Sequence, residues 1–374
     1  MDGRSADVLI CGASFAGLAV ARELAGAGAD VLVVDRYAIG ERATSACAAP
    51  TPWLRALGLE RAIRQDIPAM RFGTPHGTHR YVLPWSWSAF DYRELCLALW
   101  EQCGDAEFQC AKVEERTAGG VRTDRGALVA PLVVDALGWR RVLSGPPATG
   151  GYQPPDAPLS RGLEVHPHWA GGRDLDVWVD RSLIRSGYAW QVPAGGEQRV
   201  GVGSYAPRDH VKEPVRDLAG RLDMEAERWQ GNWFPHRLRP AVDGATFFVG
   251  DSAGHCLPLS GEGIRTAWYF GAACGASLRH VLDGRASAEE ARLGYAAFSA
   301  SHARTYQLLL RGQQLLPRVP PRLLDVVFRA LSRPALVNRA FRWYLAQAAP
   351  PLVAEVGYSA SGASMTTSTV PVST

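Results

Sequence analysis

Apolar residues near the N-terminus fall in short unbroken runs, which is typical of strands buried on both faces of a sheet. The first run covers residues 8–10 and the second covers residues 31–34, and apolar residues at helical spacing lie between them. Glycines follow the helical stretch, as they commonly do at helix ends. This pattern predicts a strand–helix–strand unit over residues 7–35, with Asp35 at the C-terminal end of its second strand.

The rest of the chain alternates between strand-like and helix-like stretches. Strand-like patterns cover residues 70–90, 107–113, 120–123, 127–135, 160–206 and 246–251. Helical patterns cover residues 53–63, 91–102, 212–230 and 263–282, and most of the chain from there to residue 349. The strand-like stretches between residues 107 and 135 suggest a small meander. Dense proline and glycine at 145–158 predict a crossing between domains, and the Ser/Thr-rich end from residue 359 is predicted to be disordered.

Length, charge and cysteine content limit the interpretation. A chain of 374 residues is longer than one simple core usually needs, so a composite of domains is expected. The net charge of +3 is too small to indicate nucleic-acid binding. The seven cysteines show no CxxC pair and no His/Cys metal spacing, which predicts reduced thiols and no metal site. The chain shows no charged-then-apolar leader and no apolar run of membrane-spanning length, so a cytoplasmic protein is expected.

Residues 12–17 read Gly-Ala-Ser-Phe-Ala-Gly, directly after the first strand. This is the dinucleotide fingerprint G-x-G-x-x-G with Ser14 in the second glycine position, and serine is small enough to let the backbone approach a phosphate. A helix N-terminus here would offer N–H groups and a positive dipole end to a pyrophosphate. Asp35 is placed to accept a ribose hydroxyl, and Arg36 to reach the adenosine part. The alternative is an ordinary strand–turn–helix connection.

The most specific stretch is residues 250–264, Gly-Asp-Ser-Ala-Gly-His-Cys-Leu-Pro-Leu-Ser-Gly-Glu-Gly-Ile. The preceding strand delivers Asp251 to its C-terminal end, where the sheets of α/β proteins bind ligands. Gly261 and Gly263 let the backbone lie flat against a ring, and the next helix points its positive N-terminus there, which suits the negative charge of a reduced flavin. A glycine-rich active-site loop of another kind is the alternative.

Together with the N-terminal unit, this stretch resembles the FAD-binding flavoproteins of the para-hydroxybenzoate hydroxylase type and, more narrowly, the geranylgeranyl reductase family. The family carries Gly-Asp-x-x-Gly followed by Pro-x-x-Gly-x-Gly, as at residues 250–263. The resemblance implies that Asp251 meets the ribityl chain and that Gly261, Gly263 and Ile264 lie beside the isoalloxazine. It also implies phosphate and ribose contacts from Gly12, Ser14, Gly17, Asp35 and Arg93.

A second motif of that family is Tyr/Phe-x-Trp-x-Phe-Pro, followed by seven or eight residues and Gly-x-Gly. Residues 188–193 and 201–203 match it except at Val192, which replaces the phenylalanine. In the family this strand pair walls the isoprenoid site. Strand alternation independently puts Tyr188 and Trp190 on one face, toward a ligand or toward a core.

Two further positions bear on catalysis. The reductases carry a cysteine close to the flavin in the loop after the second strand, and Cys47 holds that place, although alanines follow it where the family usually has glycines. With a reference pKa near ~8.5 such a thiol could donate a proton, and the alternative is a small buried apolar residue. The Asp-Gly motif that ties the hydroxylases to FAD and NAD(P)H is degraded here to Asp135-Ala136, which leaves the electron donor open.

The C-terminal helical region carries arginines at steps of seven and four, which keeps them near one helical face. They are Arg304, Arg311, Arg318, Arg322, Arg329 and Arg333, and leucines, valines and Phe328 lie between them. Prolines break the run into at least two helices. The pattern favours a membrane-surface helix that admits a lipidic substrate, or a helical cap with a solvated arginine edge.

The predicted fold is therefore α/β, with an FAD-binding Rossmann-type domain of the para-hydroxybenzoate hydroxylase-like kind, an inserted β-sheet substrate domain and a helical C-terminus. The FAD domain is predicted from residues 1–68, 91–145 and 236–283, and the substrate domain from residues 69–90 and 146–235. Residues 284–350 are predicted as C-terminal helices and residues 351–374 as a disordered tail.

The predicted function is FAD-dependent reduction of carbon–carbon double bonds in an isoprenoid or other apolar polyene. Cys47, Tyr188 and Trp190 are the predicted catalytic residues, and the electron donor is NAD(P)H or a reduced protein partner. The alternatives are an FAD-dependent monooxygenase of a small aromatic or polyketide, and a non-redox flavin-dependent cyclase or isoprenoid-binding protein. The predicted partners are an apolar or lipid substrate, the inner face of the membrane and an electron-donor protein, without nucleic acid.

Overall fold

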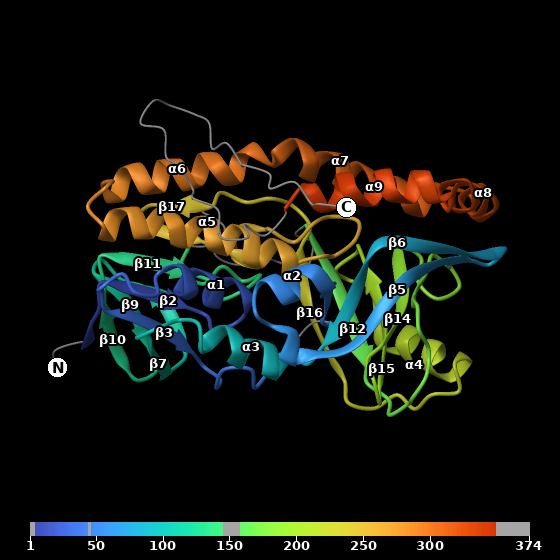
Figure 1. Ribbon diagram of the computed structural model, residues 1–374, viewed down its shortest axis with the longest axis horizontal. Coiled ribbons are helices and arrows are strands. Elements are labelled where there is room, and N and C mark those ends of the chain that lie inside the picture. Colours follow the sequence, from blue (N-terminus) through green and yellow to red (C-terminus); the bar gives the residue numbers. More distant parts are fainter. Residues whose placement is uncertain (1–3, 44–45, 145–157, 349–374) are drawn as a thin grey trace.

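The computed structural model describes residues 4–43, 46–144 and 158–348. At the centre of the first half of the fold lies a six-stranded sheet of order β17-β18-β11-β2-β3-β7, in which all neighbours are parallel except β17 and β18 (Figure 1). Its strands are β2 (Val8–Cys11), β3 (Val31–Asp35), β7 (Glu107–Cys110), β11 (Leu132–Asp135), β17 (Val242–Asp243) and β18 (Thr246–Phe248). Helix α1 (Phe15–Glu23) joins β2 to β3, which confirms the predicted strand–helix–strand unit.

Small residues hold α1 close to the long helix α5 (Ile264–Leu282), which lies beside it in Figure 1. A Cβ on Gly271 would lie 2.8 Å from the carbonyl oxygen of Ala16, and a Cβ on Gly275 would lie 2.9 Å from that of Val20. Larger side chains at these two glycines would push the helices apart. The contact therefore fixes the two glycine-rich loops that precede α1 and α5 relative to each other.

The predicted meander between residues 107 and 135 is wrong in its outer members. Strands β8 (Val113–Arg116), β9 (Gly120–Thr123) and β10 (Gly126–Val129) form a separate antiparallel sheet, which β1 (Arg4–Ser5) joins in parallel to β10. Strands β7 and β11 instead pair in parallel within the central sheet. The reason for β11 is burial on both faces, because all four of its residues are buried, as parallel sheets require.

The second half of the fold is an eight-stranded sheet of order β16-β12-β15-β14-β13-β5-β6-β4 (Figure 1). Its strands are β4 (Ala48–Pro50), β5 (Ile63–Thr74), β6 (Gly77–Phe90), β12 (Leu159–Val165), β13 (Leu175–Trp178), β14 (Gly187–Pro193), β15 (Gln198–Ser204) and β16 (Gln230–Pro235). Helix α4 (Lys212–Arg221) packs on β12 and β15 over a valine-rich core. The sequence interpretation placed the first boundary between the two domains at residue 69. Strand β4 and the start of β5 lie before that residue, although both strands belong to the eight-stranded sheet. The domain bounds stay a prediction.

Three predicted elements are shorter in the structure than in the sequence pattern. The helix expected over residues 53–63 is α2 (Thr51–Ala56) followed by a single 3-10 turn, η1 (Glu60–Ala62), because Gly58 turns the chain at φ +69°. The helix expected to reach residue 230 stops at Arg221, since Asp223 adopts a left-handed φ of +55°. The strand expected over residues 246–251 ends at Phe248, so that Asp251 lies in the 3-10 turn η3 (Gly250–Ala253).

One helix begins where the sequence indicates, and the chain after α5 is largely helical, as predicted. Helix α3 (Tyr92–Trp100) starts after Asp91, whose carboxylate accepts the Glu94 N–H at 3.0 Å. Helices α6 (Ala288–Ser301), α7 (Ala303–Leu315), α8 (Pro321–Leu331) and α9 (Pro334–Ala346) run along one side of the molecule, over both large sheets (Figure 1). Within the described ranges no helix has the length and apolar character needed to cross a bilayer. The predicted domain crossing before residue 158 and the predicted tail lie outside the described residues.

Candidate functional site

The turn between β2 and α1 is built so that only glycine fits at its two ends. Gly12 has φ +113°, and a Cβ there would lie 2.3 Å from the carbonyl oxygen of Ala136. A Cβ on Gly17 would lie 1.9 Å from the carbonyl oxygen of Gly12. Ser14 is the N-cap, but its side chain caps no helical N–H and instead accepts the Tyr92 hydroxyl at 3.0 Å. The first turn of α1 therefore presents N–H groups without a side-chain cap, which is the arrangement that binds a phosphate.

Asp35 supports this turn from the end of β3. Its carboxylate accepts the Ala13 N–H at 2.9 Å and the Tyr37 N–H at 3.1 Å, which leaves acceptor capacity for a ribose hydroxyl. Arg36 is exposed, with its guanidinium carbon 4.7 Å from the centre of the Tyr37 ring. Arg93 is also exposed, near the start of α3.

Asp135, at the end of β11, connects three segments of the site. Its fully buried carboxylate accepts the N–H groups of Leu137 at 2.9 Å and Leu143 at 2.8 Å, and the Ser252 hydroxyl at 2.7 Å. Burial raises the pKa of Asp135, although these hydrogen bonds oppose the rise. The degraded Asp-Gly motif is thus a structural junction that holds η3 against the central sheet. Two signals marked Asp135 in the sequence, namely its place at a strand end and its match to the first residue of the Asp-Gly motif.

Asp251 lies in η3 beside the second glycine-rich loop. A Cβ on Gly263 would lie 3.9 Å from Oδ1 of Asp251. Burial raises the pKa of Asp251 to about 6, while the charge of Arg239 opposes the rise. Within the described part of the chain no donor is hydrogen-bonded to the Asp251 carboxylate, and Nη2 of Arg239 is buried without a partner. A carboxylate acceptor and a guanidinium donor that both lack a partner among the described residues fit the hydroxyls and phosphates of an FAD molecule.

The loop before α5 touches the eight-stranded sheet. Gly261 has φ +67°, and a Cβ there would lie 2.9 Å from the Tyr188 hydroxyl oxygen. The Tyr188 hydroxyl donates a hydrogen bond to the carbonyl oxygen of Ser260. Gly263 is the N-cap of α5, which has no side-chain cap, and Ile264 packs into the core around the central sheet. The structure therefore brings Tyr188, Gly261, Gly263, Ile264 and Asp251 together.

Tyr188 and Trp190 share one face of β14, as strand alternation predicted, with ring centres 5.8 Å apart. Trp190 lies over β15, where a Cβ on Gly201 would be 2.3 Å from its ring and a Cβ on Gly203 would be 3.2 Å from it. Both side chains are half-buried. The Gly-x-Gly of the second motif therefore leaves room for the Trp190 indole.

The sequence interpretation missed a buried acid on the same face. Glu164 of β12 is 3% exposed, and its carboxylate accepts the Trp190 indole N–H at 2.9 Å. It also accepts the Gln230 amide and lies 2.9 Å from Nε2 of His166. Burial opposes the charge, but the contacts with His166, Gln230 and Trp190 hold the pKa of Glu164 below its ordinary value. An acid in the interior of a predicted strand was the available signal.

Cys47 is buried just before β4, with a left-handed φ of +52°. Its carbonyl oxygen accepts the Phe90 N–H at 2.9 Å and a guanidinium N–H of Arg199 at 3.0 Å. These bonds fix the backbone of the loop. The catalytic role of the Cys47 thiol stays a prediction.

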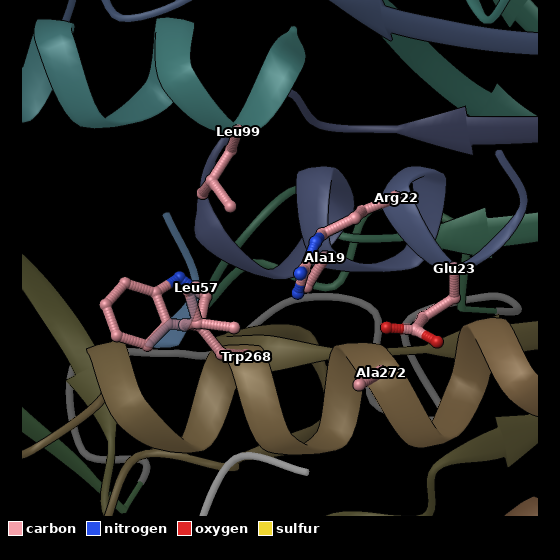
Figure 2. Close-up of a pocket in the computed structure, with 7 residues that line it drawn as sticks. All are labelled: Ala19, Arg22, Glu23, Leu57, Leu99, Trp268 and Ala272. Carbon is pink, nitrogen blue, oxygen red and sulfur yellow. The ribbon is translucent and has the colours of Figure 1, made fainter. Parts of the chain in front are cut away.

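A surface crevice between α1, α3 and α5 is separate from this site. Figure 2 shows its lining residues, which are Ala19, Arg22, Glu23, Leu57, Leu99, Trp268 and Ala272. None of them is a predicted site residue. Among the residues that the structure describes, no group of three or more His, Cys, Asp and Glu side chains is arranged to hold a metal ion.

Comparison with known proteins agrees with this geometry. Residues 7–104 match the family described as FAD dependent oxidoreductase. A menaquinone reductase from Mycobacterium tuberculosis is 26% identical over 90% of this chain and 90% of its own length. Among solved structures, a geranylgeranyl bacteriochlorophyll reductase-like protein from Thermoplasma acidophilum has a TM-score of 0.77 at 16% identity, covering 94% of this chain and 98% of that one.

A second kind of neighbour is PqsL, a probable FAD-dependent monooxygenase from Pseudomonas aeruginosa, with a TM-score of 0.64 at 19% identity over 88% of this chain and 99% of that one. The fold is therefore that of the FAD-binding flavoproteins, as the sequence resemblance predicted. The family match supports an FAD-dependent oxidoreductase with FAD as its cofactor.

Proposed function

We propose that this protein reduces carbon–carbon double bonds of an isoprenoid or other apolar polyene, with FAD as its redox cofactor. The observation that carries the proposal is the contact between Tyr188 and the Ser260–Gly261 loop. Through it, the aromatic strand of the eight-stranded sheet adjoins the loop that would hold the flavin. The names of two relatives, a menaquinone reductase and a geranylgeranyl bacteriochlorophyll reductase-like protein, support substrates of this class.

The residues divide into two groups in this proposal. The first group would hold the adenosine and phosphate parts of FAD. It consists of Gly12, Ser14 and Gly17 at the start of α1, together with Asp35, Arg36 and Arg93. Asp251 and the Gly261–Ile264 segment would hold the ribityl chain and ring. Bound FAD, once reduced by NAD(P)H or a reduced protein partner, supplies a hydride. Addition of that hydride and one proton leaves the substrate two hydrogens heavier, and Cys47 is the candidate proton donor.

The aromatic pair has a specific electrostatic role in the proposal. An unactivated alkene gains positive charge as the proton arrives, and the faces of Tyr188 and Trp190 can stabilise that charge by about 0.5–2 kcal/mol each. Glu164 adds to this, because a carboxylate that accepts the indole N–H of Trp190 raises the electron density of the ring. The structure thus offers a reason for a buried acid beneath an aromatic surface.

The second candidate function is hydroxylation, favoured by the likeness to PqsL. A reduced sample of the FAD-loaded protein, mixed without oxygen with a geranylgeranyl or menaquinone substrate, distinguishes the two. A reductase reoxidises its flavin without oxygen, and mass spectrometry finds a product with two added hydrogens. A flavin that is reoxidised only with oxygen, with a product one oxygen atom heavier, would establish a monooxygenase instead.

A further inference from the structure

Helix α8 exposes apolar side chains on one face. Leu323, Val326 and Val327 are exposed to 52%, 60% and 38%, and Leu331 at the end of the helix to 43%. Their spacing of three and four residues puts these side chains on neighbouring positions of one helical stripe. A helix at the surface of a globular protein normally turns polar side chains outward. The stripe of Leu323, Val326, Val327 and Leu331 is called the α8 stripe below.

The opposite face of α8 is firmly packed, so the helix is held in one orientation. The Phe328 ring lies 5.6 Å from that of Phe72, and the Tyr81 hydroxyl donates to the Phe328 carbonyl oxygen at 2.7 Å. Asp325 accepts the Thr74 hydroxyl at 3.0 Å and lies 3.0 Å from Nε2 of His79. These contacts with β5 and β6 use the one acid of the helix and leave the α8 stripe facing away from the sheet.

The C-terminal helices that include α8 are rich in positive charge. Residues 303–348 contain eight arginines, no lysine and a single acid, Asp325, whereas the whole chain has 40 basic and 37 acidic residues. The eight are Arg304, Arg311, Arg318, Arg322, Arg329, Arg333, Arg339 and Arg342, and all are exposed. Arg322 and Arg329, seven residues apart, follow one edge of the stripe. On α9, Leu336 and Trp343 are also exposed, to 40% and 44%.

We propose that the α8 stripe and its arginines dock on an anionic lipid surface. The apolar side chains would enter the interface between headgroups and acyl chains, and the guanidinium groups would meet the lipid phosphates. An acidic protein partner would match the charge as well, but charge of one sign spread over three successive helices beside exposed aliphatic side chains fits a membrane better. This proposal is independent of the reaction that the protein catalyses.

The docking helices are tied to the candidate site. Arg265, fully buried in the first turn of α5, pairs with Glu262 at 2.7 Å and donates to the carbonyl oxygens of Leu345 at 3.0 Å and Ala348 at 2.7 Å. The end of α9 is therefore bonded to the loop that carries Gly261 and Gly263. A protein docked through α8 and α9 would hold that loop in a fixed relation to the bilayer.

The test is co-sedimentation of the FAD-loaded full chain with phosphatidylcholine vesicles, with and without phosphatidylglycerol. Wild type should sediment with the anionic vesicles, less so as salt rises. The variant Val326→Asp/Val327→Asp puts charge into the apolar stripe, and Arg322→Glu/Arg329→Glu reverses the charge along its edge. Each should lower the partition coefficient by ~10-fold or more. Val129→Asp and Arg125→Glu, at exposed positions in and beside β10, are matched controls and should bind as wild type does.

Three results would overturn the proposal. They are wild type that stays in solution with anionic vesicles at low salt, α8 variants that sediment like wild type, and self-association that the same variants abolish without any vesicle binding. The last result would show that a second copy of the chain covers the stripe. FAD absorbance and melting temperature verify that the variants fold. Because the vesicles contain no substrate, failure of the reductase proposal leaves this test unaffected.

Discussion

The two large sheets meet at the Ser260–Gly261 loop, but they contribute different chemical groups to the site. On the side of the central sheet the elements are mainly backbone, with glycines at positive φ and uncapped helix N-termini at α1 and α5. On the side of the eight-stranded sheet they are side chains, with two aromatic rings over glycines and the buried Glu164 network. Backbone groups suit a ligand that is always the same, such as a cofactor. Side chains can be exchanged in evolution to suit a particular substrate.

This contrast predicts that substitutions in the two regions fail in different ways. Changes around the central sheet should reduce FAD binding. Changes on the aromatic face should leave FAD bound and alter the reaction with substrate.

The largest effect is expected from Asp251→Ala. Among the described residues, the Asp251 carboxylate is the only one beside the Gly261–Ile264 segment that accepts no hydrogen bond. The substitution therefore removes the acceptor proposed for the ribityl hydroxyls. The dissociation constant for FAD should rise by roughly 10–100-fold, since a hydrogen bond to a charged group contributes about 1.5–3 kcal/mol. Equilibrium dialysis of FAD measures it, with the exposed Asp105→Ala as the control. A folded, fully yellow mutant would exclude Asp251 from the cofactor site.

A smaller loss of FAD is expected from Asp35→Ala. The side chain accepts two backbone N–H groups that shape the turn, so its removal both loosens that turn and deletes the ribose acceptor. Asp35→Asn keeps one amide oxygen as an acceptor and should retain more of the affinity. If Asp35→Ala binds FAD as wild type does, β3 does not reach the adenosine half.

The fate of particular residues shows what the sequence could predict. The strand–helix–strand unit and α5 were predictable, because parallel strands are unbroken apolar runs and glycines mark sharp turns. The place of β11 and β7 in the central sheet was not, since short apolar strands look alike whichever neighbours they pair with. Glu164 was missed because its partners, Trp190 and Gln230, come from strands that are distant in sequence and become adjacent only through sheet register.

A pH effect separates the two regions without any substrate. Burial raises the pKa of Asp251 from its ordinary value of 3.8 to about 6. Between those values the folded protein without FAD binds a proton that the unfolded chain has released, so stability falls as pH rises through that window. Asp251→Asn should therefore be more stable than wild type by up to about 3 kcal/mol at pH 7, and the difference should vanish below about pH 3.

Urea unfolding of both FAD-free proteins across this pH range measures the effect. Glu164→Gln should not reproduce it, because the pKa of Glu164 is lowered and its charge is stabilising at neutral pH. Parallel pH curves for wild type and Asp251→Asn would contradict the assignment.

The smallest and most informative effect concerns Trp190. Trp190→Phe keeps an aromatic wall but weakens its attraction for a cation, since tryptophan is the best such partner, so the flavin reoxidation step with substrate should slow by about 2–5-fold without oxygen. The slowing should appear in the chemical step more than in substrate binding, because the positive charge exists mainly in the transition state. FAD content should not change, since Trp190 contacts β12 and β15 and no predicted cofactor residue.

The structure adds a stability cost to this prediction, because Trp190→Phe leaves Glu164 without its indole donor at a buried position, which costs about 1–3 kcal/mol. The double variant Trp190→Phe/Glu164→Gln removes the charge that has lost one of its donors and should recover part of the lost melting temperature while staying slow. Glu164→Gln alone keeps an acceptor for the indole N–H but removes the charge behind the ring, so it should slow the same step and leave substrate affinity unchanged. Unaltered reoxidation rates in all three variants, with a verified substrate, would mean that the aromatic face packs the sheet and the substrate meets the flavin elsewhere.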